Sequence, residues 1–249
     1  MRTIPRRTAL AVVPMLVAFA ACSESPSAVT TIDEQVNLDV ATFVADQTGD
    51  DLILMTLGGD QIMGPQTGPP FDASISYSRT VTFYDESDAV QAAYDPDLTA
   101  KLNIVADLEG SRTRTWDGGT MTVEINRHRD LWVSGLLGQE TSRTWDGEGN
   151  SDVSRVAQSD ERGTRTYDMT SSTLIAGVVI PVPRSADGWP LEGTITRQVT
   201  VVVVNGLGDT ITRERTVVIT FNGTQFVTAT VNGEEFEIDL AARRAHRRH

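Results

Sequence analysis

The sequence predicts an all-β protein: a large antiparallel meander whose sheet is curved or nearly closed, preceded by one N-terminal amphipathic helix. From residue 71 onward, runs rich in Val, Ile, Thr and aromatic residues alternate with Gly, Asn and Asp, which is typical of strands joined by turns. No stretch between these runs is long enough for a crossover helix, so consecutive strands must pair antiparallel. A single sheet of roughly ten to twelve strands has to curl or pack on itself.

The chain begins with the features of a secretory signal over residues 1–21. Arg2, Arg6 and Arg7 precede an apolar run that ends in small residues, as in exported proteins. The run is interrupted by Pro14 and is too short to span a bilayer. We therefore expect the protein to be exported.

The segment "AFAACSESPS" around Cys22 resembles the lipobox of bacterial lipoproteins, in which a cysteine after small residues receives a diacylglyceryl group. Cys22 is the only cysteine, so its thiol has no internal disulfide partner and is well placed for a thioether to lipid. The resemblance implies a lipid-anchored protein of the bacterial cell envelope, and Ser23 after the cysteine implies the outer membrane. Residues 22–32 then form the lipidated cysteine and a flexible tether. Ordinary cleavage that leaves a free thiol is the alternative.

The chain after the signal is strongly acidic. Residues 1–21 hold three basic and no acidic residues, so 18 basic residues remain against 34 acidic ones, a net charge of −16. Such a surface repels nucleic acid, whose binding needs a basic patch. The one basic cluster, in residues 241–249, consists of Arg243, Arg244, Arg247 and Arg248. It predicts a frayed basic tail, with contact to an anionic membrane surface as the alternative.

A helix is predicted only in residues 33–57. Val36, Val40 and Phe43 fall on one helical stripe, which indicates an amphipathic helix from Asp33 to about Gln47, resuming from Asp50 to Leu57. Residues 58–70 are rich in Gly and Pro and are expected to form a loop into the β domain, residues 71–240.

Two hairpins are predicted at Asn222-Gly223 and Asn232-Gly233, because Asn-Gly favours the positive φ angles of a type I′ turn. Two-residue turns would place Ile219 opposite Phe226 and Thr230 opposite Glu235. This register gathers four apolar residues on an otherwise polar face: Val217, Ile219, Phe221 and Phe226. We expect this cluster either to be covered by another segment or to form an open ligand-binding patch.

A short sequence motif of arginine, threonine and an aromatic residue, here called the Arg and aromatic phrase, recurs as "SRTRTWD", "SRTWD" and "TRTYD". Strand alternation places the arginines and aromatic residues on one face and the threonines on the other. Such a face could hold a sugar or an acidic polymer by stacking and bidentate hydrogen bonds. We favour a structural role, a Thr and Arg ladder on an exposed sheet face, because acidic partners are abundant.

No catalytic motif is present, and the three histidines offer no catalytic arrangement, since His128 lies between two arginines and His246 and His249 lie in the basic tail. We therefore expect no enzyme and no cofactor. The best metal candidate is a weak calcium loop, "DGEGNSD", with four oxygen-bearing side chains at alternate positions: Asp146, Glu148, Asn150 and Asp152. It fails as an EF-hand because Ser151 and Ala157 replace the required Gly and Glu. We expect a hairpin loop there and no assigned metal.

The strand series from "SRTVTFYD" to "FNGTQFVTATVNGEEFEIDL" resembles that of bacterial envelope lipoproteins with an Arg- and Thr-rich β domain. This resemblance implies a cellular location and a fold but no activity. Two functional hypotheses follow for a monomeric, membrane-anchored protein. The first is a non-enzymatic carrier that binds an apolar or amphipathic, lipid-like ligand in its curved sheet. The alternative is a structural or interaction module that binds another envelope component through an acidic, Thr-rich sheet face.

Overall fold

The computed structural model describes residues 32–60, 74–116, 119–138, 140–159, 163–182, 188–204 and 209–248. The predicted signal, Cys22 and the tether up to residue 31 lie outside these residues, as does most of the predicted Gly/Pro loop.

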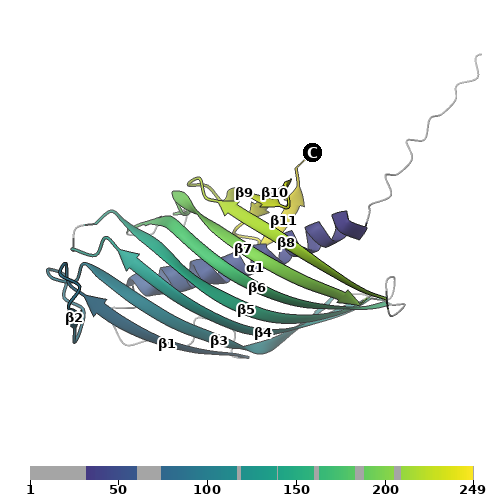
Figure 1. The fold of residues 1–249 in the computed structure, drawn as a ribbon, viewed down its shortest axis with the longest axis horizontal. Helices are drawn as coiled ribbons and strands as arrows, with labels where there is room; N and C mark the ends of the chain where they lie inside the picture. The colour runs from purple at the N-terminus through teal and green to yellow at the C-terminus, as the bar shows by residue number, and fades with distance from the viewer. Residues whose placement is uncertain are drawn as a thin grey trace, which may run out of the picture. The chain divides into compact units, whose positions relative to one another are not determined.

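One antiparallel sheet of eleven strands accounts for nearly all of the described chain, in the order β11-β10-β9-β8-β7-β6-β5-β4-β3-β1-β2. Figure 1 shows the strands following one another side by side along the sheet. The strands are β1 (Ile75–Tyr84), β2 (Val90–Gln91), β3 (Lys101–Trp116), β4 (Gly119–Ser134), β5 (Ser142–Ser159), β6 (Gly163–Pro181), β7 (Glu192–Val204), β8 (Thr210–Thr220), β9 (Phe226–Val231), β10 (Glu234–Asp239) and β11 (Arg244–Arg247). The predicted antiparallel meander is confirmed.

Several strands are longer than predicted because they run through segments that carry turn residues. β5 passes through the expected turn at Asp146-Gly147 with only a bulge between Trp145 and Gly147. β4 likewise runs without interruption through His128. Each of these strands is paired along both edges, and this pairing outweighs the local preference of Asp and Gly for turns.

The helix α1 (Ile32–Asp60) is continuous and is enclosed by the sheet. The expected interruption near Gly49 is absent. Between Val40 and Met55, buried residues occur on every side of the helix, so α1 is not amphipathic in the predicted sense. In Figure 1 it runs across the back of the sheet. A helix that lacks an exposed face in its middle is a core element of the fold.

Alternation along the strands separates an inner face, which packs on α1, from an outer face. On β3 the inner face includes Leu102, Ile104 and Ala106, which are at most 3% exposed. Side chains of α1 form hydrogen bonds to β3, β4, β5, β6, β7, β8 and β10. The helix therefore fills the concave side of the described sheet.

The two predicted hairpins have different outcomes. At Asn232-Gly233 both residues have positive φ, and Thr230 pairs with Glu235 as predicted. At Asn222-Gly223 only Gly223 has positive φ, and Ile219 pairs with Ala229 instead of Phe226. This shift by an odd number of residues reverses the face of every side chain on β8 relative to β9.

The predicted frayed tail is also wrong for the described residues up to 248. Residues 241–243 form a turn, and β11 pairs with β10. Arg247 donates a hydrogen bond to the backbone oxygen of Glu34, and Arg248 lies 3.9 Å from a carboxylate oxygen of Glu235. Acidic neighbours on α1 and β10 therefore order the basic C-terminus.

Candidate functional site

The sheet separates its charges by face. The arginines on β1 to β8 whose side chains the structure describes occupy inward positions: Arg79, Arg112, Arg127, Arg129, Arg143, Arg155, Arg165, Arg197, Arg213 and Arg215. The carboxylates on the described parts of the same strands occupy outward positions: Asp107, Glu109, Glu124, Asp130, Asp146, Glu148, Asp152, Asp168, Glu192 and Glu214. The two faces must therefore be considered separately.

The inner face holds a buried ion cluster centred on Asp51 of α1. Arg129 Nε donates to Asp51 Oδ1 at 2.9 Å, and Arg197 Nη2 donates to Asp51 Oδ2. All three residues are 0% exposed. Burial by itself raises the pKa of Asp51, but the charges of Arg129, Arg197 and Arg127 outweigh burial and hold this pKa well below its usual value.

Two further helix carboxylates extend this cluster. Asp50 accepts hydrogen bonds from Arg127 at 3.1 Å and from Arg243 at 2.6 Å. Asp46 accepts one from Arg112. Burial lowers the pKa of Arg129 to about 10, with the charge of Asp51 opposing the shift, so Arg129 remains charged at neutral pH. The cluster fixes the position of α1 on the sheet.

The repeated Arg and aromatic phrase belongs to this inner face, which corrects the predicted exposed ladder. Arg143 is 5% exposed, Trp145 is 1% exposed and Tyr167 is 6% exposed. Tyr167 donates a hydrogen bond to Asp39 of α1 at 2.9 Å. An extended sugar or polymer has no access to these buried side chains as a row.

The predicted apolar ligand patch is not formed. Val217 and Ile219 are 0% exposed and Phe221 is 3% exposed, all three in the core. Phe226 is 48% exposed and starts a strand whose next residue, Val227, points inward. The shifted register at the β8–β9 turn is the cause, because it turns the first three residues toward α1.

The weak calcium candidate also fails on geometry. Asp146, Glu148, Asn150 and Asp152 lie along β5, where a hairpin loop was expected. Alternate residues on a strand are about 7 Å apart, too far for four side chains to converge on one ion. Within the described residues, no group of three or more His, Cys, Asp or Glu side chains could hold a metal ion.

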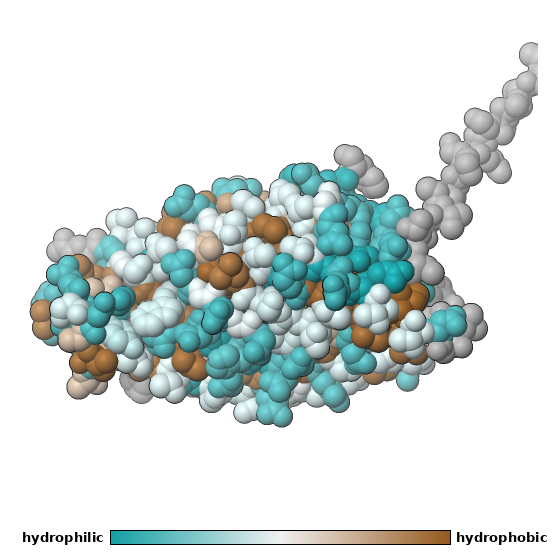
Figure 2. Space-filling view, viewed as in Figure 1, coloured by the Kyte–Doolittle hydropathy of each residue, from teal (hydrophilic) through white to brown (hydrophobic). Residues whose placement is uncertain are grey.

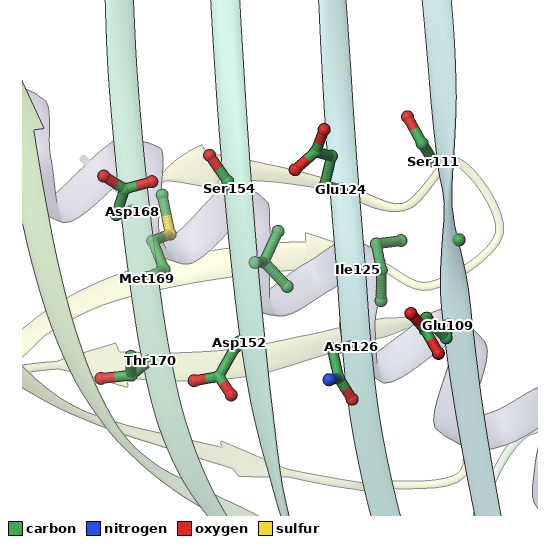
Figure 3. A pocket seen from close by; sticks show the side chains of 12 residues that line it. Glu109, Ser111, Glu124, Ile125, Asn126, Asp152, Ser154, Asp168, Met169 and Thr170 are labelled. Carbon is green, nitrogen blue, oxygen red and sulfur yellow. The ribbon is translucent and has the colours of Figure 1, made fainter.

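The outer face carries a groove of about 520 Å³ that crosses β3, β4, β5 and β6. Figure 2 shows this face as a mixture of hydrophilic residues and residues of intermediate hydropathy, with separate hydrophobic patches. Two rows of side chains flank the groove, labelled in Figure 3: Asp168, Ser154, Glu124 and Ser111 form one, and Thr170, Asp152, Asn126 and Glu109 form the other. Between the rows lie residues whose side chains point inward, including Ile125 and Met169.

Because of the strand register, charged and neutral side chains alternate in the groove both along each strand and from one strand to the next. Glu124 faces Ser111 and Ser154 across the two neighbouring strands. Asp152 faces Asn126 and Thr170 in the same way. Because no carboxylate of the groove directly faces another, direct like-charge repulsion is avoided. Carboxylates within one row are then separated by two strand spacings, about 10 Å.

The four groove carboxylates, Glu109, Glu124, Asp152 and Asp168, have no basic partner within the described part of the chain. The outward Lys101 of β3 pairs with Asp88, and the outward His128 of β4 has its Nδ1 2.8 Å from Asp107, so neither side chain is directed at the groove carboxylates. The groove is therefore a negative surface with free carboxylates and neutral hydroxyl and amide groups between them. Such a surface attracts cations.

The sequence predicts an acidic, Thr-rich face but not this groove. The alternation of Glu124 with Asn126, and of Asp152 with Ser154, is visible in the sequence. This alternation predicts outward positions only if β4 and β5 are continuous strands. The turn residues within both segments favoured loops there instead.

The comparisons with known proteins add no further constraint. A scan against protein-family models finds no match to the chain. Neither the curated proteins nor the solved structures include a significant match. Among the described residues, no helix combines the length and the apolar character that crossing a membrane requires.

Proposed function

We propose that this chain is a non-enzymatic, lipid-anchored protein of the bacterial outer membrane that binds a cationic segment of another envelope component. The observation that carries the proposal is the outer groove, with its four unpaired carboxylates across β3 to β6. Its binding chemistry is the pairing of carboxylates with Lys or Arg side chains, aided by the hydroxyl and amide groups between them.

The inner face supports the interaction module over the lipid carrier. A carried lipid would need the concave side of the sheet, and α1 occupies it. Displacing the helix would separate the buried Asp51 from Arg129 and Arg197. Breaking such buried pairs costs several kcal/mol, about 3–5 for each. The outer groove is accessible without any such change.

An extended basic segment fits the groove better than a single ion. The carboxylates are about 10 Å apart within a row. They are too far apart to coordinate one metal ion, but each can pair with a different lysine or arginine side chain of an extended segment. Binding to this surface should weaken as salt is added, because the pairs remain close to solvent. A monomeric chain presents the groove in full.

The test measures binding of a hexalysine peptide to the chain from residue 23 onward, which retains the whole described fold. A variant with Glu109→Gln, Glu124→Gln, Asp152→Asn and Asp168→Asn should bind at least tenfold more weakly. The matched control neutralises four exposed carboxylates elsewhere, Glu86, Asp97, Glu192 and Glu214, and changes the net charge equally. Equal weakening in both variants would reduce the interaction to net charge and overturn the groove as the site.

Membrane attachment is tested separately through Cys22. Palmitate labelling and membrane fractionation of the full chain should show a lipidated, membrane-bound protein. Cys22→Ser should abolish the label and release the chain from the membrane fraction. A soluble wild-type protein without label would reject the anchor while leaving the groove test intact.

A further inference from the structure

A second pocket, of about 420 Å³, lies at the connection between β4 and β5. Its lining comes from the segment before β3, the turn between β4 and β5, the start of β5 and the residue after β6: Tyr94, Pro96, Gly138, Glu140, Arg143 and Val182. The size falls within the range of small-molecule sites, about 300–1,000 Å³. None of these residues belongs to the outer groove.

The pocket contains one buried charge pair. Arg143 Nε and Nη2 both donate to Glu140 Oε1, at 3.2 and 2.8 Å. The side chains are only 6% and 11% exposed. Arg143 Nη1 donates to none of the residues that line the pocket. One edge of the guanidinium is thus fixed by Glu140, and its remaining donors are available to a ligand.

Glu140 serves to orient the arginine. Burial raises the pKa of this carboxyl, but the hydrogen bond from Arg143, together with those from its own backbone N–H and that of Gly138, lowers the pKa below its usual value. The carboxylate is therefore ionised and paired with Arg143. A buried arginine held in this way is preorganised for a planar anion.

Tyr94 supplies a second polar group. Burial and the charge of Glu140 raise the pKa of its hydroxyl, so the hydroxyl keeps its proton at neutral pH and can donate a hydrogen bond. Its ring makes an edge contact with Phe83 at a centroid distance of 6.0 Å, which fixes the ring at the pocket wall. The rings of Tyr94 and Pro96 and the side chain of Val182 provide apolar surface.

We propose that this pocket binds a small organic acid with one carboxylate and an apolar body. The carboxylate accepts hydrogen bonds from the free edge of Arg143 and from the Tyr94 hydroxyl, and the apolar body contacts Pro96 and Val182. A monoanion is favoured over a phosphate dianion because Glu140 already neutralises most of the arginine's charge. This site is independent of the proposed function of the outer groove.

The experiment is an NMR titration of the 15N-labelled chain from residue 23 onward, with benzoate as the probe and benzamide and benzylammonium as matched neutral and cationic probes. Benzoate should shift the resonances of Gly138, Arg143 and Val182 and bind at least tenfold more tightly than either control. Stronger binding of benzamide or benzylammonium, or shifts located elsewhere, would overturn the proposal. Inorganic phosphate in a fourth titration should bind more weakly than benzoate, and the reverse order would also reject an organic acid site.

Variants separate ligand binding from folding. Val182→Phe fills the pocket and leaves the Arg143–Glu140 pair in place, and Tyr94→Phe removes only a hydroxyl. Both should keep the wild-type spectrum outside the pocket, and they should weaken benzoate binding at least tenfold and about threefold, respectively. The variant with four neutralised groove carboxylates should bind benzoate as wild type does. Unchanged benzoate binding in Val182→Phe would reject the pocket even if the groove is confirmed.

Discussion

The inner and outer faces of the sheet carry opposite charges and use them in different ways. Inside, Arg129 and Arg197 are 0% exposed and are paired with Asp51. Outside, Glu124 and Asp152 are exposed and have no basic partner among the described residues. The comparison shows that a charged residue type does not by itself indicate a binding site. What distinguishes the faces is whether the charges are already satisfied within the fold.

The inner face also shows why arginine, usually a surface residue, can occupy a core. A buried ion pair gains little net stability because desolvation opposes the Coulomb attraction, yet removing one partner is costly. The pairs between α1 and the sheet therefore act mainly to select one position for the helix among the positions that its apolar side chains would accept.

The largest difference between the two faces is expected when a carboxylate is introduced on each face of one strand. Val217 is 0% exposed, whereas Val218 points outward. Val217→Asp should lower the free energy of unfolding by more than about 4 kcal/mol or prevent folding, because the new charge is buried. Val218→Asp should cost about 1 kcal/mol through lower β propensity. Urea unfolding followed by circular dichroism measures both.

This pair of variants also tests the register that the sequence alone predicted incorrectly. A two-residue turn at Asn222-Gly223 would place Val218 in the core and Val217 outside. The turn signal involves only the two turn residues, whereas burying Val217, Ile219 and Phe221 contributes about 1.5–3 kcal/mol for each side chain. At Asn232-Gly233 the local signal and the burial pattern agree, and there the prediction is confirmed.

The fold class was predictable because it depends on local composition and alternation. The buried arginines were harder to identify because their partners lie far away in sequence: Asp51 and Arg197 are 146 positions apart. One signal was available: Arg127 and Arg129 share the alternation of Val123, Ile125 and Leu131. Arginines at core positions of a strand, together with an acidic helix, indicate internal pairing.

Removing one carboxylate from each face should have very different effects on the free energy of unfolding. Asp51→Ala leaves Arg129 and Arg197 buried without their partner, so the free energy of unfolding should fall by about 3–5 kcal/mol. Glu148→Ala on the outer face should change it by less than about 0.5 kcal/mol, because Glu148 is exposed and faces Asp130 across the strands. Chemical denaturation measures both variants, and equal losses would contradict the assignment of the faces.

The stabilising contribution of Asp51 on the inner face should depend on pH. Because the folded-state pKa of Asp51 is lowered, its stabilising contribution is complete above the unfolded pKa of about 3.9 and is lost as the pH falls toward the folded value. The stability difference between wild type and Asp51→Asn should be constant from pH 5 to 8. It should then shrink by about 1.4 kcal/mol for each pH unit below about 3.9. Denaturation curves at pH 7 and pH 3 measure this, and a constant difference down to pH 3 would contradict it.

The smallest predicted effect concerns Gly49 of α1. At this position the neighbouring ion cluster should remove the stabilisation that Gly→Ala usually gives in a helix. Gly→Ala inside a helix usually stabilises it by about 1 kcal/mol. Here a Cβ would lie 2.5 Å from Arg243 Nε, so the Arg243 side chain would have to shift, which disturbs its pairs with Asp50 and Asp46. Gly49→Ala should therefore be neutral or destabilising in the wild-type background, as measured by thermal unfolding. In an Arg243→Ala background the same substitution should recover its usual stabilising effect, because the space that glycine kept open is no longer occupied.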